Sequence, residues 1–307
     1  MIERELTDFL IAAATGAAVT AGRKIMEIYN DDGIIEASLN SNNTIITKAG
    51  RLSHESIKSS LAPTRIPVMS EEGRNILYEE RFRWDLYWLV DPLDGTREFV
   101  AHNPEFVVSI ALMVENKPLF GVIYIPAEER LFFSDPDRGA FVMNNPICFA
   151  DASTPPSVNR IFSDARRLVR QPWEPSKPLR VAITRSHINR DTEHFVNLIK
   201  KRYPHNEIIE CGSSKKFCLI AEDKADVYVR LTGMLDWDVA AGHAITEAVG
   251  AKTHHIDGNP IVYNDASLEI PPFITRYDAM QYDYDIVSLD GFAPYGNGGP
   301  SLSNAGL

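Results

Sequence analysis

The chain has 307 residues, of which 44% are hydrophobic and 24% charged, and its formal net charge is −11 at pH 7. This composition is that of a folded globular protein with room for one or two domains. The acidic balance argues against general binding to nucleic acid or to anionic membranes, while leaving room for a local basic pocket that binds a small anion. The three cysteines include no CxxC pair, which argues against a disulfide framework or a zinc site and indicates reduced thiols in the cytoplasm.

The first half of the sequence predicts helices followed by a largely antiparallel sheet. Apolar residues recur at helical spacing from 4 to 29, so we expect one long amphipathic helix there and a second at 51–61. The N-terminal flank lacks the basic residues of a secretory signal, and no run of 18 apolar residues exists, so we expect no membrane-spanning segment. Strands separated by turn sequences are expected at 66–72, 86–92, 106–114, 118–126, 130–134 and 140–143.

After a proline-rich stretch at 154–178 the pattern changes to alternating strands and helices. The expected strands are 180–184, 206–210 and 225–231, and the expected helices are 190–203, 214–222 and 238–249. This alternation predicts a parallel or mixed sheet covered by helices. We therefore expect an α/β protein with an N-terminal α+β subdomain at 1–150 and a C-terminal α/β subdomain at 151–275. Residues 276–307 are rich in Gly, Ser, Pro and Asn and predict a flexible tail.

The stretch WLVDPLDGTREFV, from 88 to 100, is the most informative for function. Asp91 and Asp94 stand where an apolar strand ends, and the residues between them must turn the chain for the two carboxylates to converge, because side chains three apart in a strand face opposite ways. Gly95 and Thr96 then open a helix whose N–H groups suit a phosphate. Acidic oxygens beside such an anion site favour a bridging hard cation, of which Mg²⁺ is the default.

A purely structural interpretation, in which Asp91 caps and Asp94 turns the chain, would suffice for an isolated D-x-x-D sequence. A second acidic pair argues against this structural interpretation, since Glu71 and Glu72 also follow an apolar strand. Adjacent residues point to opposite faces, so only one of the two glutamates is expected to reach a metal. Taken alone, the pair would more often be two solvated glutamates.

The third acidic stretch is LDWDVAAGHAI, from 235 to 245. Asp238 is well placed to cap a helix that begins at Val239 and to offer its carboxylate to a metal, with Asp236 as the competing ligand. Three separated acidic stretches at element ends predict a phosphoester site with two or three metal ions. The spacing D-x-x-D-G-T differs from the D-x-D-G-T of haloacid-dehalogenase-type phosphatases, so we expect metal-activated water as the nucleophile, not an aspartyl-phosphate.

The stretches SEE, VDPLDGT and WDVAAG resemble, in order and in approximate separation, the metal-binding motifs of the inositol monophosphatase superfamily. Within it, the chain looks most like the bacterial 3′(2′),5′-bisphosphate nucleotidases of the CysQ type, on EFVVSIALM, GVIYIP, TRSH and GSSKKFCLIAEDKADVYVRL as well. The resemblance covers about residues 5–275. It implies a layered α/β/α/β/α fold and a lithium-sensitive, Mg²⁺-dependent phosphatase of sulfur metabolism, which hydrolyses 3′-phosphoadenosine 5′-phosphate to AMP and phosphate.

The resemblance also assigns roles to individual residues. As ligands of two or three Mg²⁺ ions it implies Glu71, Asp91, Asp94, Asp238 and the Leu93 carbonyl, and in catalysis Thr96, Asp91 and Glu71. As substrate-binding residues it implies Gly95, Thr96, His187, Ser213, Lys216, Arg230 and Asp238. Two permanent cations, a hydroxyl and an imidazole form a reasonable pocket for a second phosphate. Taken singly, the lysine and the arginine would more often be surface charges, and the histidine structural.

One position departs from the pattern of the superfamily. The stretch NSNNTIITKAG ends in Gly50, where relatives carry an aspartate that works with the threonine equivalent to Thr96 to position and deprotonate the attacking water. Three interpretations stay open. The chain is a phosphatase whose rate is lowered by about 10²–10⁴-fold, a nucleotide-binding protein with impaired catalysis, or an enzyme in which a neighbouring group takes the place of the aspartate. If the position is simply vacant, Gly50→Asp should raise kcat.

The runner-up activity is that of an inositol monophosphatase-like sugar phosphatase. The stretch GSSKKFC together with Arg230 favours the bisphosphate substrate, because a second phosphate needs these cations and a monophosphate does not. We expect a small phosphorylated nucleotide as the partner, with no nucleic-acid polymer and no transmembrane segment. The expected location is the cytoplasm, and a peripheral association with the inner membrane stays open.

Overall fold

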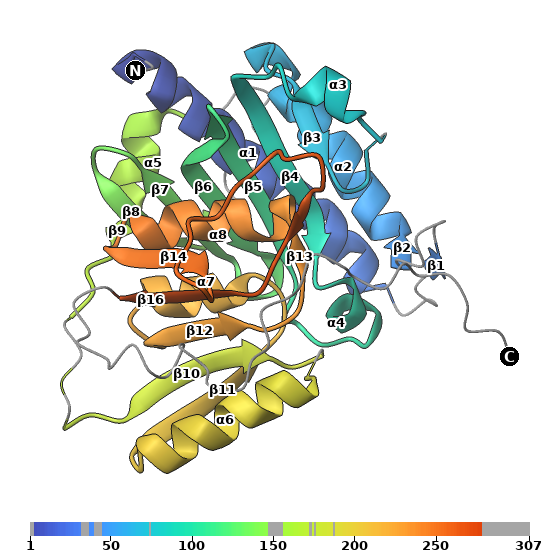
Figure 1. Cartoon of the computed structure of the whole chain (residues 1–307). Helices are drawn as coiled ribbons and strands as arrows, with labels where there is room; N and C mark the ends of the chain where they lie inside the picture. The colour runs from blue at the N-terminus through green and yellow to red at the C-terminus, as the bar shows by residue number, and fades with distance from the viewer. Residues whose placement is uncertain are drawn as a thin grey trace, which may run out of the picture.

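Helices and sheets alternate in five layers, in the order helix, sheet, helix, sheet, helix (Figure 1). The computed structural model describes residues 3–31, 37–39, 45–73, 75–146, 156–171, 174, 176–186 and 188–277. Apolar side chains fill the spaces between the layers in three clusters. One lies between the first helical layer and the larger sheet, one surrounds the middle helices between the two sheets, and one lies between the smaller sheet and the last helix. The α/β fold class and its α/β/α/β/α layering, expected from the sequence, are confirmed.

The larger sheet has seven strands in the order β3-β4-β5-β6-β7-β8-β9. The strands are β3 (Val68–Ser70), β4 (Leu86–Asp94), β5 (Val107–Val114), β6 (Lys117–Ile125), β7 (Arg130–Asp135), β8 (Gly139–Asn144) and β9 (Arg166–Arg167). All neighbours pair antiparallel except β3 and β4, which are parallel. The expected antiparallel arrangement is therefore confirmed from β4 to β8, and the parallel edge brings the ends of β3 and β4 to the same side.

The outer face of this sheet is covered by α1 (Arg4–Tyr29) and α2 (Lys48–Leu61), with α5 (Val158–Asp164) beside α1. By length and composition α1 could cross a membrane, which the sequence analysis did not anticipate. However, 67% of its most apolar window is buried inside the protein, as in the core helix of a globular protein. The helix packs on β5 and β6 and against α2, so its apolar face has a partner within the fold.

Two helices, α7 (Lys215–Ala221) and α8 (Asp236–Glu247), lie between the two sheets. The smaller sheet has the order β11-β10-β12-β16-β14 and is mixed, as expected. Its strands are β10 (Leu179–Thr184), β11 (Asn206–Cys211), β12 (Val227–Arg230), β14 (Ala251–His255) and β16 (Phe273–Tyr277). Helix α6 (Arg190–Arg202) covers its outer face through Phe195 and Ile199.

The remaining elements are short, and several of them carry the loops around the site. They are β1 (Ala37–Leu39), β2 (Ile45–Thr47), α3 (Tyr78–Arg81), α4 (Thr96–Val100), β13 (Met234–Leu235), β15 (Glu269–Ile270) and the 3₁₀ turns Ala62–Thr64 and Pro126–Glu128. Because α8 packs on β4, β5 and β6 and also on β14, the apolar core is continuous between the sheets. The subdomain boundary at 150 stays a prediction. Of the predicted tail, 276 and 277 belong to β16, and the rest lies outside the described residues.

Candidate active site

The centre of the site is the end of strand β4. Asp91 pairs with Ser109 of β5 and Asp94 with Val107. Between these two pairs β4 advances by three residues and β5 by only two. This irregularity is a bulge, and it rotates the chain between the two aspartates. Oδ1 of Asp91 accepts a hydrogen bond from the Leu93 N–H at 3.0 Å, which fixes the bulge from within. The turn expected at Pro92–Leu93 is therefore real, and both carboxylates face the same space.

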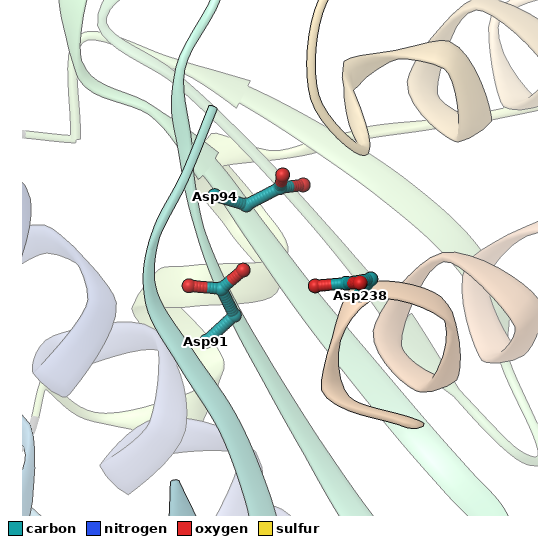
Figure 2. Close-up of side chains that lie close together, drawn as sticks. All are labelled: Asp91, Asp94 and Asp238. Atoms are coloured by element: carbon teal, nitrogen blue, oxygen red, sulfur yellow. The ribbon is translucent and has the colours of Figure 1, made fainter. Parts of the chain in front are cut away.

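Asp238 approaches these two aspartates from the first turn of α8 (Figure 2). One carboxylate oxygen from each of Asp91, Asp94 and Asp238 lies within 4.8 Å of the others. The expectation that Asp238 precedes the helix was wrong, because α8 begins at Asp236. Oδ2 of Asp238 accepts a hydrogen bond from the Leu235 N–H at 2.9 Å. The side chain therefore reaches back from the first turn of the helix to the residue that precedes it.

Asp236, the competing ligand, points elsewhere. Its carboxylate is 1% exposed and accepts the Asn264 N–H at 2.7 Å, with the positive charge of Arg81 nearby. Asp236 is not part of the aspartate cluster. The structure thus separates two aspartates that the sequence could not distinguish: one holds a neighbouring loop, and the other joins Asp91 and Asp94.

Glu71 completes the acidic group from the neighbouring strand. It follows β3 directly, its N–H donates to the Val90 carbonyl at 3.2 Å, and its carboxyl hydrogen-bonds that of Asp91. Burial, followed by the negative charge of Asp238, raises the pKa of Glu71 to about 8. Glu71 is therefore the member of the Glu71–Glu72 pair that joins the cluster, while Glu72 turns towards the start of α2.

The pKa values of the three aspartates are raised in the same way. Burial is the largest cause at each, followed by the charge of Glu71 at Asp91 and of Asp94 at Asp238, whose pKa reaches about 7. At Asp94 hydrogen bonds from Ser214 and the charge of Lys216 moderate the rise. No described lysine or arginine forms an ion pair with these four carboxylates. Hard oxygen donors that repel one another and lack a cation suit Mg²⁺, which would replace the protons.

Beside the acids, Gly95 and Thr96 form the turn into α4. Gly95 has φ +89°, and a Cβ atom there would lie 3.0 Å from the Glu105 carbonyl oxygen and 3.1 Å from the Cβ of Ser213. Glycine is thus required both by the backbone conformation and by the close approach of the loop that carries Ser213. The Thr96 hydroxyl donates to the Leu93 carbonyl at 3.0 Å, so one lone pair of that predicted metal ligand is already used.

The loop before α7 is tied directly to the aspartates. The Ser214 N–H donates to Oδ2 of Asp94 at 2.5 Å, and its hydroxyl donates to the Asp238 carbonyl at 2.6 Å. Lys216 is buried, and its ammonium donates to the carbonyls of Cys211 at 3.0 Å and Ser213 at 2.5 Å. Sequence reasoning selected Ser213 and missed Ser214, because nothing in GSSKK shows which hydroxyl faces the acids.

Arg230 ends β12 close to the acidic group, and its charge lowers the pKa of the Asp238 carboxyl against the effect of burial. Its Nε is buried and has no hydrogen-bond partner among the described residues. On the same side, Arg185 binds both oxygens of Glu105, at 2.9 and 3.0 Å. His187, two residues further on, lies outside the described residues. Ser213 thus lies beside Gly95, Lys216 near Asp94 and Arg230 near Asp238, and their substrate-binding roles stay predictions.

Comparison with known sequences agrees with this geometry. Residues 6–282 match the profile of the Inositol monophosphatase family. The chain belongs to the inositol monophosphatase family. All of the acidic group, the Gly95–Thr96 turn and Arg230 fall within the matched segment.

Within this family, the chain is similar to proteins described as 3′(2′),5′-bisphosphate nucleotidase CysQ. It is 34% identical to that of Shigella flexneri over 80% of this chain and 90% of the relative. It is 36% identical to that of Buchnera aphidicola, over 81% and 86% respectively. The crystal structure of CysQ from Bacteroides thetaiotaomicron, described as a bacterial member of the inositol monophosphatase family, superposes with a TM-score of 0.76 at 37% identity. That superposition covers 86% of this chain and 96% of that chain.

Proposed function

We propose that this protein is a Mg²⁺-dependent phosphatase that removes the 3′-phosphate of 3′-phosphoadenosine 5′-phosphate to give AMP and phosphate. The observation that carries the proposal is the convergence of four carboxylates, one buried and three partly buried, from three separate elements beside a turn that suits a phosphate. The similarity to bacterial CysQ proteins, at 34% and 36% identity, supports the choice of substrate.

In this proposal Glu71, Asp91, Asp94 and Asp238 hold two or three Mg²⁺ ions, with the Leu93 carbonyl as a further ligand. Bound Mg²⁺ would neutralise phosphate oxygens and stabilise the charge that develops on the leaving oxygen. The N–H groups of the Gly95–Thr96 turn hold the scissile phosphate. Water supplies the new P–O bond while the ester P–O bond breaks, and the leaving 3′-oxygen ends with a proton. Asp91, Glu71 and Thr96 act by fixing these partners in place.

The second phosphate of the substrate is assigned to the basic side of the site. Arg230 offers a buried Nε without a partner among the described residues, and Ser213 and Lys216 belong to the loop that contacts Asp94. His187 is assigned to the same phosphate. We place the protein in the cytoplasm, and the two described cysteines, Cys211 and Cys218, are buried and free, in agreement with reduced thiols.

Release of inorganic phosphate tests the proposal. With millimolar Mg²⁺, the purified chain should hydrolyse 3′-phosphoadenosine 5′-phosphate at least about tenfold more efficiently than inositol 1-phosphate, as expected when a second phosphate is bound by charge-assisted hydrogen bonds. Chelation of Mg²⁺ should abolish turnover, and Li⁺ should inhibit it. A preference for inositol 1-phosphate would instead make the protein a sugar phosphatase. Tight binding of the bisphosphate without turnover would make it a nucleotide-binding protein.

A further inference from the structure

The carboxylate of Glu72 occupies the space beside Gly50. Gly50 lies in the first turn of α2, where its N–H donates to Oγ1 of Thr47 at 3.0 Å. A Cβ atom added to Gly50 would lie 2.6 Å from Oε1 of Glu72 and 3.5 Å from that same threonine oxygen. The first distance is shorter than any ordinary van der Waals contact. The Glu72 carboxylate therefore fills the volume that a side chain at position 50 would need.

This volume adjoins the acidic group. Glu72 follows Glu71, whose carboxyl bonds that of Asp91. From the other side, the hydroxyl of Ser53, one turn after Gly50, donates to the Pro92 carbonyl at 2.7 Å. The first turn of α2 is thereby held against the bulge that separates Asp91 from Asp94. The backbone on both sides of the Glu72 carboxylate, at the end of β3 and in α2, is thus held at the edge of the site.

The two oxygens of Glu72 accept no hydrogen bond from any residue that the structure describes, and among these residues Arg51 supplies a positive charge that acts on the carboxylate. The side chain is only partly exposed. A partly buried carboxylate normally satisfies its lone pairs, since leaving them unpaired costs free energy. Other glutamates of the chain show this, such as Glu105, which accepts hydrogen bonds from Arg185 and from Gly212. Glu72 therefore keeps acceptor capacity for a water molecule beside Gly50, close enough to the acidic group for its charge to act on Glu71.

We propose that Glu72, reaching across Gly50, holds the water that attacks phosphorus, so that the turn after β3 supplies the carboxylate that position 50 lacks. This inference rests on the proposed phosphatase function. The water oxygen forms the new P–O bond, the ester bond breaks with its electron pair on the leaving oxygen, and the proton lost by water is carried to that oxygen or to solvent. Glu72 accepts a hydrogen bond from this water and orients its lone pair.

Substitutions that exchange the two positions test the inference. Glu72→Ala and Glu72→Gln should lower kcat for phosphate release by about 10²–10⁴-fold, with KM within about threefold of the wild-type value. Gly50→Asp combined with Glu72→Ala should recover at least about tenfold of that loss. Gly50→Asp alone should not raise kcat, since its carboxylate competes with Glu72 for one space. The matched control is Glu79→Gln, an exposed glutamate on α3, which should change nothing.

Readouts other than turnover separate this role from a structural one. Both Glu72 variants should keep the wild-type melting temperature within a few degrees and bind Mg²⁺ with unchanged affinity by calorimetry. Normal kcat in Glu72→Ala, or no recovery in the double variant, would overturn the inference and leave the phosphatase intact. Loss of Mg²⁺ binding in Glu72→Gln would overturn it in favour of a metal-binding role. A wild-type protein that releases no phosphate from any tested ester would overturn the proposed function, and this inference with it.

Discussion

Two buried aspartates of this protein, Asp226 and Asp91, have opposite surroundings. Asp226 is 0% exposed, and its Oδ1 accepts from Nη2 of Arg170 at 2.9 Å and of Arg180 at 2.7 Å. Its Oδ2 accepts from the backbone N–H of Arg180 at 2.9 Å and from Nε of that residue at 3.0 Å. Asp135 is likewise 0% exposed and paired with an arginine, because its Oδ1 accepts a hydrogen bond from Arg4. These carboxylates are balanced by cations of the chain itself.

Asp91, at 1% exposure, has acidic neighbours instead, chiefly Glu71, Asp94 and Asp238. A buried charge without a partner is costly, and several like charges together are costlier. The chain compensates Asp226 with arginines, so the absence of such pairing among the described neighbours of Asp91 is a feature of this site and not of the protein as a whole. Protons can supply the compensation, as the raised pKa values of Glu71 and Asp238 indicate, and in the proposed function a divalent cation would replace them.

Asp91→Asn should give the largest difference between the acidic group around Asp91 and the arginine-paired Asp226. Removing a ligand from the centre of the acidic group should lower phosphate release by at least about 10³-fold. The same substitution removes one of several repelling charges, so the metal-free protein should melt at the same temperature or higher. Phosphate assays and thermal melts in EDTA measure both effects. A large loss of stability in EDTA would show that Asp91 belongs with Asp226 after all.

Asp226→Asn should show the opposite behaviour. The change deprives Arg170 and Arg180 of a carboxylate that both bind, and breaking a buried ion pair from one side costs about 3–5 kcal/mol. Denaturant unfolding should show this loss, while kcat measured well below the melting temperature should stay within about twofold. Asp226 lies directly before β12, four residues before Arg230, so a fall in kcat without a fall in stability would contradict the assignment of Asp226 as structural.

The sequence predicted the fold well where one signal dominates. The helix expected at 4–29 coincides with α1, because apolar residues repeat every turn over its whole length. The helix expected at 51–61 in fact begins at Lys48, since Thr47 caps it by accepting the Gly50 N–H. That cap was not recognisable within the unfamiliar stretch before it. Local patterns thus place elements, while their ends depend on single hydrogen bonds.

The site was predictable only as separate acidic stretches. Spacing alone puts Asp91 and Asp94 on opposite faces, and the bulge that reunites them depends on pairing with β5. The choice between Asp236 and Asp238 depends on Asn264, which is distant in sequence. The approach of Glu72 to Gly50 likewise requires α2 to dock beside the end of β3, which no local pattern shows. Convergence is a property of packing, and sequence patterns describe one segment at a time.

A pH series sharpens the comparison further. Because the folded pKa values of Glu71, about 8, and of Asp238, about 7, exceed their ordinary values, the metal-free fold is favoured while these groups are protonated. That stability is fully present below the ordinary pKa values of 4.5 for Glu71 and 3.8 for Asp238, declines as the pH rises above them, and is lost once the pH passes about 8 and about 7 respectively. In EDTA the melting temperature should fall by about 5 °C between pH 5.5 and 8.5. Added Mg²⁺ should reverse the fall, with a larger increment at the higher pH, where fewer protons compete.

Asp236→Asn is the finest test, because Asp236 and Asp238 share the first turn of one helix. Burial raises the pKa of Asp236 to about 7 against the charge of Arg81, and Asn keeps an acceptor for the Asn264 N–H, so we expect the stability to change by no more than about 1 kcal/mol. Mg²⁺ affinity and kcat should stay within about twofold of the wild-type values. In the matched Asp238→Asn variant Mg²⁺ affinity should fall by more than about tenfold, which calorimetry would show. Equal losses of Mg²⁺ affinity in both variants would mean that the whole helix end, and not the one carboxylate that meets Asp91 and Asp94, holds the metal.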